Sequence, residues 1–230
     1  MSLLHLLHGR LVFERRVDRL ADALAARLPA NASVLDAGCG DGSIAYAIIE
    51  RRPDVTITGV DVLVRAETRI PVVGYDGSSL PFPERSFDAV CLVDVLHHAD
   101  DPQHLLAEAA RVSRDRILIK DHVADGFLAE PTLRLMDWIG NARHGVSLPY
   151  NYLTHGDWRE HLGRAGVTVR SWDTDLLLYP PPLSAVFGRG LHVLMDIDAS
   201  RPSPVGHQRW RGLTAPGCRR LPSGSDPTSR

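Results

Sequence analysis

The feature that most constrains the fold of this chain is a glycine-rich turn behind a short apolar segment. Residues 34–42 read Val-Leu-Asp-Ala-Gly-Cys-Gly-Asp-Gly, which places three glycines at alternate positions. Glycine lets the backbone turn sharply and lets a ligand approach the main chain. Residues 33–36 before the turn read as a buried strand, and residues 43–52 behind it read as a helix. This order predicts the start of an open α/β sheet, in which the carboxyl end of the first strand borders the ligand crevice.

The rest of the chain alternates strand-like and helical segments. Further strands are predicted at 55–60, 71–75, 87–93, 116–120, 167–172 and 191–197. Helices are predicted at 11–28, 101–112 and 158–164, the last behind a capping box formed by Thr154 and Asp157. The alternation predicts a Rossmann-like α/β fold, with a doubly wound, mostly parallel seven-stranded sheet and helices on both faces.

We expect three regions along the chain. Residues 1–29 would form an N-terminal helical cap, residues 30–198 the main domain, and residues 199–230, rich in Pro, Gly, Ser and Arg, a disordered tail. Segment 123–152 is too long for an ordinary connection and mixes aromatic and amide side chains with glycines. We interpret it as a substrate lid, the alternative being a structural insertion packed on the domain.

The composition of the chain argues against several classes of binding partner. Hydrophobic residues make up 44% of the chain, enough for a buried core, and the net charge of -2 gives no reason to expect nucleic acid or an anionic membrane. The three cysteines are far apart, which argues against a disulfide framework or a zinc site. No apolar run is long enough to span a membrane, and no signal peptide is evident. We therefore expect a soluble, cytoplasmic protein.

The spacing of the three glycines helps to distinguish between possible cofactors. A dinucleotide fingerprint reads G-x-G-x-x-G, whereas this chain has G-x-G-x-G. Asp61 ends the predicted second strand, where an acid can accept both hydroxyls of a ribose. That acid alone does not separate NAD from S-adenosylmethionine, so an NAD(P)-dependent oxidoreductase stays as an alternative.

Four motifs carry a resemblance to a known family. Residues 34–42 resemble motif I of the class I S-adenosylmethionine-dependent methyltransferases, and Gly59-Val60-Asp61 resembles their acidic position behind the second strand. Residues 76–88, DGSSLPFPERSFD, resemble the family's D-x-x-x-L-P-F-x-x-x-S-F-D segment. Residues 95–98, VLHH, resemble the stretch behind its fourth strand, and all four occur in the family's order.

The resemblance implies S-adenosyl-L-methionine as cofactor and assigns roles to individual residues. Gly38 and Gly40 would leave room for its methionine part, with Asp36 near the amino group. Asp61 would hold the ribose, Val62 would pack on the adenine, and Asp76, beside Gly77, would accept from the adenine amino group. Asp94 and His98 would reach the cofactor or the reaction centre, although a helix cap is an equal alternative for Asp94. The implied cofactor site comprises Asp36, Gly38, Cys39, Gly40, Asp61, Val62, Asp76, Gly77 and Asp94.

The predicted reaction is methyl transfer to an oxygen or carbon of a small molecule, such as a lipid, a quinone precursor or a secondary metabolite. Such a nucleophile often needs a base, and the candidates are His98, His122 and His144, although each alone is more often structural. His122 follows Lys120 and Asp121 at the expected carboxyl edge of the sheet. A metal held by His97, His98, Asp121 and His122 is a weaker alternative, because the sequence fixes no geometry for it, so no metal site is predicted. A cofactor-binding module without catalytic activity is the remaining alternative.

Overall fold

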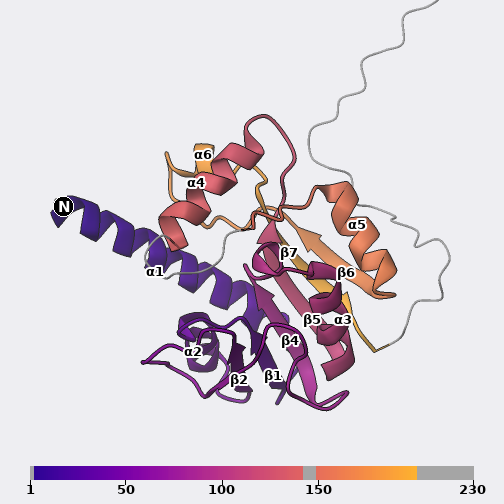
Figure 1. The fold of residues 1–230 in the computed structure, drawn as a ribbon. Helices are drawn as coiled ribbons and strands as arrows, with labels where there is room; N and C mark the ends of the chain where they lie inside the picture. Colours follow the sequence, from indigo (N-terminus) through magenta and orange to yellow (C-terminus); the bar gives the residue numbers. More distant parts are fainter. Residues whose placement is uncertain (1–2, 142–148, 201–230) are drawn as a thin grey trace, which may run out of the picture.

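The computed structural model describes residues 3–141 and 149–200. His144 and the greater part of the predicted tail lie outside these residues. Figure 1 shows one sheet with helices against it and with α4 and α6 above the ends of its central strands. Among the described residues, no helix is both long enough and apolar enough to cross a membrane.

The sheet has seven strands in the order β3-β2-β1-β4-β5-β7-β6. Neighbouring strands from β3 to β5 are parallel, and β7 runs antiparallel to β5 and β6. This arrangement confirms the predicted fold class, and the chain order reverses between β1 and β4, where such sheets bind ligands. The strands are β1 Ser33–Ala37, β2 Thr56–Asp61, β3 Val72–Gly74, β4 Phe87–Val93, β5 Ser113–His122, β6 Thr168–Asp173 and β7 His192–Asp198.

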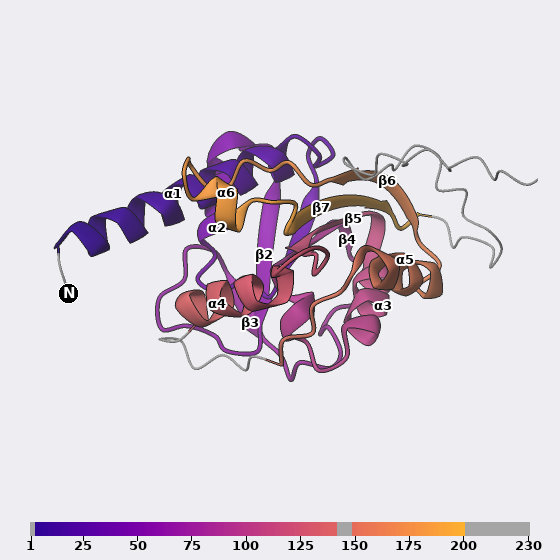
Figure 2. The ribbon, with the colours of Figure 1, turned by 90° about the horizontal axis from the view of Figure 1, so that it is seen from above.

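Helices cover both faces of the sheet. Helices α1 and α2 lie on one face and α3 and α5 on the other (Figure 2). Each face has its own apolar core, with Leu24 and Ile48 in the first and Leu106 and Trp158 in the second. The helices are α1 Leu3–Ala25, α2 Ser43–Arg51, the short 3-10 helix η1 Leu96–His98, α3 Pro102–Val112, α4 Ala129–Asn141, α5 His155–Arg164 and α6 Ser184–Phe187.

Local capping explains where two of these helices begin. The side chain of Asp101 accepts a 2.9 Å hydrogen bond from the amide of His104, and Pro102 takes the first helical position. At α5, Thr154 and Asp157 form the predicted capping box, which is confirmed. The helix behind it begins at His155, earlier than predicted.

Other predictions about elements were wrong. The first helix was predicted at 11–28 but runs from Leu3 to Ala25. The fifth strand was predicted at 116–120 but runs from Ser113 to His122, because β7 pairs with it from Arg116 to His122 and so holds its polar end in the sheet. No helix was predicted within 123–152, yet α4 occupies part of that segment. Its buried positions, Ala129, Leu133 and Asp137, include a carboxylate, which hides the helical pattern in the sequence.

Candidate active site

The glycine-rich loop behind β1 is fixed by hydrogen bonds to the end of β2. The amide of Gly38 donates to the carbonyl of Val60 at 2.7 Å. The amide of Gly40 donates to Oδ2 of Asp61 at 2.8 Å, and Oδ1 of Asp61 accepts from the amide of Leu63 at 2.8 Å. Asp61 thus holds the loops behind two neighbouring strands.

The loop leaves space for a ligand on one side only. A Cβ atom at Gly38 would lie 2.4 Å from Cγ2 of Val95, so this glycine is required by the packing of the loop behind β4. A Cβ atom at Gly40 would meet nothing nearer than Nε of Arg65 at 3.8 Å. Both glycines have positive φ angles, of 77° and 59°. The open side at Gly40 is a cradle that fits the methionine part of the predicted cofactor.

Asp36 lies at the base of this loop and is 6% exposed. Burial raises the pKa of its carboxyl group to about 7, and the nearby charge of Asp61 adds to the effect. A cationic group close by would stabilise the carboxylate, as the predicted amino group of the cofactor would.

Cys39 differs from its neighbours because its side chain packs inward. A Cβ atom added at Gly59 of β2 would lie 2.5 Å from the Sγ atom of Cys39. Burial raises the pKa of the thiol to about 12, so the thiol is protonated near neutral pH. The role of Cys39 toward the cofactor stays a prediction.

The residues predicted to meet the adenine lie at the rim of the crevice. Val62 is 62% exposed, and Asp76 and Gly77 are also exposed. A Cβ atom at Gly77 would lie 3.2 Å from Cγ1 of Val62, which places these two residues side by side. Oδ1 of Asp76 accepts a hydrogen bond from the amide of Ser78 at 2.9 Å. Their roles toward the cofactor stay predictions.

Asp94, behind β4, forms a buried ion-pair group. Its carboxylate accepts hydrogen bonds from Lys120 of β5 and Arg16 of α1. Lys120 is 0% exposed. Burial raises the pKa of Asp94, but the two cations outweigh burial and hold that pKa well below its usual range. The structure thus places Asp94 against protein cations, and it does not cap η1, whose capping position is Val95.

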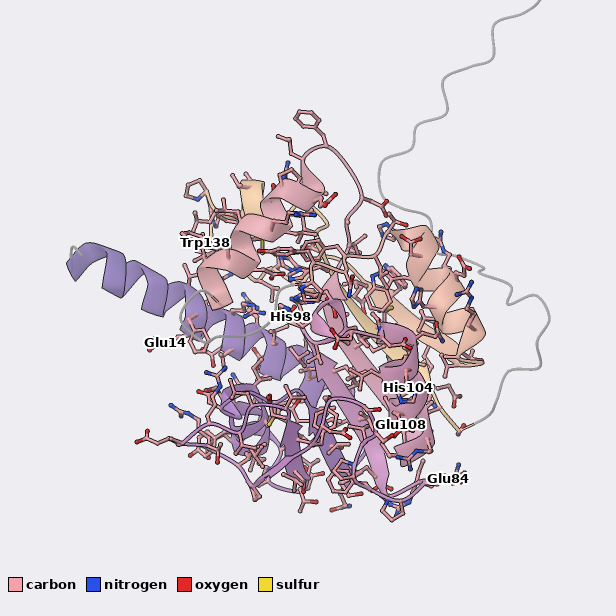
Figure 3. The ribbon with its side chains drawn as sticks, in the orientation of Figure 1. Glu14, Glu84, His98, His104, Glu108 and Trp138 are labelled. Atoms are coloured by element: carbon pink, nitrogen blue, oxygen red, sulfur yellow. The ribbon has the colours of Figure 1, made fainter. Side chains whose placement is uncertain are left out.

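Histidines and carboxylates gather beside Asp94 at the carboxyl ends of β4 and β5. Figure 3 shows His98 near the centre of the molecule, between the ends of the strands and α4. The groups come from α1, the loop behind β4, η1, β5, α4, the residues before α5, and β7. We call this group the polar cluster; it comprises Arg16, Asp94, His97, His98, Lys120, Asp121, His122, Asp137, Tyr152 and His192.

His97 lies between two carboxylates of the polar cluster. Its Nδ1 lies 2.5 Å from Oδ1 of Asp121, and its Nε2 lies 3.3 Å from Oδ2 of Asp137. Oδ2 of Asp121 accepts from the amide of Leu96 at 3.0 Å. Burial lowers the pKa of His97, but the two carboxylates outweigh burial and raise it to about 10. Sequence reasoning named His97 only within a possible metal set.

The two described catalytic candidates, His98 and His122, occupy different surroundings. His98 is half-buried, and burial together with His97 lowers its pKa to about 4, so its ring is neutral near pH 7. His122 is 4% exposed, with Nε2 at 3.6 Å from both Asp94 Oδ1 and Asp137 Oδ1. Its backbone carbonyl accepts from Nε1 of Trp158 at 2.9 Å. His98 is thus the more accessible of the two.

Asp137 and Tyr152 bring segment 123–152 into the polar cluster. The hydroxyl of Tyr152 donates to Oδ2 of Asp137 at 2.5 Å. Asn151 holds the same stretch to the chain around η1, since its Nδ2 donates to the carbonyl of Ala99 at 2.9 Å. The sequence offered a signal in the carboxylate and aromatic rings of this segment, but nothing in it showed that Asp137 is buried.

A cavity of about 540 Å³ adjoins the polar cluster on the side of β7. Its lining includes Leu177, Tyr179, Ser184, Arg189 and His192. The ring of His192 lies 5.1 Å from that of His122 and 5.7 Å from that of Tyr179, measured between centroids. The cavity has the size and the mixed polar and apolar lining of a small-molecule site.

Known proteins are similar to this chain in sequence. A methyltransferase domain family matches residues 8–171, which is more than half of the chain. The 27-O-demethylrifamycin SV methyltransferase of Amycolatopsis mediterranei is 34% identical over 116 residues, covering 44% of this chain and 42% of the relative. The malonyl-[acyl-carrier protein] O-methyltransferase of Geobacter sulfurreducens is 28% identical over 217 residues, covering 88% of this chain and 78% of the relative.

A solved structure supports the fold. The S-adenosylmethionine-dependent methyltransferase of Mesorhizobium loti superposes with a TM-score of 0.58 at 19% identity, covering 77% of this chain and 96% of that one. With the glycine-rich loop and the strand order given above, the family match decides between the cofactors that the sequence left open. The chain belongs to the methyltransferase domain family and has the class I fold, whose cofactor is S-adenosyl-L-methionine.

Proposed function

We propose that this protein transfers the methyl group of S-adenosylmethionine to a hydroxyl oxygen of a small molecule. The cofactor supplies the activated methyl group, so the chain has to align the acceptor oxygen with it and provide for loss of the hydroxyl proton. Two relatives carry names that place the methyl group on oxygen, which favours an oxygen acceptor here.

One contact carries the proposal. Val95 packs against Gly38 of the cofactor loop, and His98 follows it after one turn of η1. The polar cluster therefore lies beside the place where the loop would hold the methionine part of the cofactor. An acceptor hydroxyl that meets the accessible imidazole of His98 would lie next to the donor.

The same geometry suggests where the larger part of the acceptor lies. The cavity shares His192 with the polar cluster, and its lining combines leucine side chains with Arg189 and Tyr179. We assign the body of the acceptor to this cavity, with its hydroxyl directed toward His98. Segment 123–152 would then act as the lid, since it contributes Asp137 and Tyr152 to the cluster and Asp125 to the cavity.

Methyl transfer from isotopically labelled S-adenosylmethionine to a panel of hydroxyl-bearing small molecules tests the proposal. A Ser184→Trp variant would fill the cavity from α6 and should raise the KM for an accepted compound while leaving cofactor affinity unchanged. An exposed Glu84→Gln variant, from the turn before β4, is the matched control. Tight cofactor binding without transfer to any acceptor would instead support a binding module.

A further inference from the structure

We propose that the polar cluster binds a divalent transition-metal cation through His97, His98 and Asp137. One ring nitrogen of each histidine and one carboxylate oxygen all lie within 4.8 Å of one another. Two imidazoles and one carboxylate form a donor set that suits Zn²⁺, Co²⁺ or Fe²⁺ and leaves coordination positions open.

The spacing of the donor atoms fits a metal site. Nε2 of His97 lies 3.3 Å from Oδ2 of Asp137. Two ligand atoms that are each roughly 2.1 Å from a tetrahedral ion are about 3.4 Å apart. These two atoms are thus already at the separation that a shared cation requires, and rotation of the half-buried ring of His98 would bring in the third.

Unpartnered nitrogen atoms point to a missing ligand. Nε2 of His97 and Nδ1 of His98 are buried, and within the described part of the chain neither has a hydrogen-bond partner. The contact between His97 Nε2 and Asp137 is close but lacks hydrogen-bond geometry. Buried polar atoms without partners are rare in folded proteins, and a cation at this point would satisfy both rings.

The groups around the three ligands are those that support metal sites. Asp121 Oδ1 lies 2.5 Å from Nδ1 of His97, which fixes the ring; the cation would displace the proton of Nε2 to solvent and take that nitrogen as its ligand. Tyr152 donates to Oδ2 of Asp137 in the same way. A carboxylate–histidine–metal chain of this kind raises the basicity of the imidazole and orients it.

A cation here would join two parts of the structure. His97 and His98 belong to η1, next to the cofactor loop, whereas Asp137 belongs to α4. With His98 bound to the cation, an open coordination position would receive the acceptor oxygen and lower the pKa of its hydroxyl, so that the proton passes to solvent rather than to His98; this step rests on the proposed function. The cation itself would bind whether or not the protein methylates an oxygen.

Titration of the full chain with Co²⁺ tests the site directly. The chain is purified without a tag and treated with a chelator, and binding is followed by calorimetry and by the visible absorption of Co²⁺, which reports its ligands. We expect one equivalent to bind with the spectrum of nitrogen and oxygen coordination, and Zn²⁺ to displace it. Mg²⁺, which prefers oxygen ligands, should not compete.

Single-residue variants test whether the cation binds at these three side chains. His98→Ala and Asp137→Asn should remove the Co²⁺ spectrum, and Asp121→Asn should weaken binding by about tenfold as a change behind the ligand does. His104→Ala takes an imidazole from α3, which Figure 3 shows well apart from His98, and should change nothing. Circular dichroism checks that each variant folds.

The result that would overturn the proposal is equally specific. Absence of Co²⁺ and Zn²⁺ binding by the folded parent chain would do so, as would an unchanged spectrum in the folded His98→Ala and Asp137→Asn variants. Metal binding without methyl transfer would leave the site in place and count against the proposed function alone.

Discussion

Oδ2 of Asp61 accepts a 2.8 Å hydrogen bond from the amide of Gly40, so the acid at the end of β2 holds the loop behind β1. The same carboxylate is the one expected to bind the ribose of the cofactor. Asp61 would therefore both hold the loop and bind the cofactor, so a change at this residue should affect stability and cofactor affinity together.

Asp61→Ala should lower the affinity for S-adenosylmethionine by about tenfold to a hundredfold, because it removes a charge-assisted hydrogen bond and frees the loop. The free energy of unfolding should fall by only about 1 kcal/mol, since the carboxylate is partly exposed. Calorimetric titration and urea unfolding measure the two effects, with Glu84→Gln as control. Unchanged affinity in a folded Asp61→Ala protein would refute the assignment.

Alanine at Gly38 should mainly lower the stability of the fold, whereas alanine at Gly40 should mainly lower the affinity for the cofactor. At Gly38 the new Cβ would strike Val95 at 2.4 Å, so we expect a loss of roughly 2–4 kcal/mol in the free energy of unfolding. At Gly40 the Cβ enters open space, so the loss should be about 1 kcal/mol from the positive φ, while cofactor affinity falls.

The double variant Gly38→Ala with Val95→Ala separates packing from backbone strain. Removing the valine methyl groups should recover part of the stability lost at Gly38. Additive losses in urea unfolding would show that the contact with Val95 is not what requires this glycine.

Asp36 should make the cofactor-free protein less stable as the pH rises. The pKa of its carboxyl group is about 7 in the folded state against an ordinary value of 3.8, so the folded state holds the proton more tightly in this range. The favourable contribution is complete below the lower value and is lost as the pH rises through the upper one, by about 2 kcal/mol between about pH 5 and pH 7.

The measurement is the free energy of unfolding of the parent and of Asp36→Asn across this range. The variant cannot ionise at this position, so its stability relative to the parent should rise with pH and level off above about pH 7. A constant difference between the two proteins would show that Asp36 does not titrate in this window.

The buried pair of Lys120 and Asp94 should be strongly coupled. Lys120→Met removes one of two cations beside Asp94 and should destabilise the fold by about 3 kcal/mol, because it leaves a buried carboxylate less well compensated. Asp94→Asn in the same background should cost much less than it does alone. Additive losses in a double-mutant cycle would mean that the two side chains do not interact appreciably.

The sequence predicted the sheet well, because strand, glycine turn and helix are local patterns. Residues 87–93 and the capping box at Thr154 were placed correctly, since apolar runs and capping residues act over a few positions. The antiparallel position of β7 was not predicted, because its pairing with β5 depends on contacts between residues far apart in the chain.

Only the part of the candidate site that lies in the glycine-rich loop and at the end of β2 was predictable from the sequence. Gly38 and Gly40 stand in one local motif and Asp61 in the next one along the chain, and the structure brings the two motifs together. The polar cluster joins Arg16 of α1 to Asp94, and Asp137 of α4 to His97 and Tyr152. Helix periodicity alone cannot show that an arginine or an aspartate faces inward toward a partner in another element.

Calorimetric titration of the full chain with S-adenosylmethionine, with NADH in a parallel titration, tests the central claim most directly. We expect that one molecule of S-adenosylmethionine binds per chain and that NADH does not bind. Binding of NADH, or no binding of S-adenosylmethionine by the folded protein, would contradict the assignment of this crevice to a methyl donor.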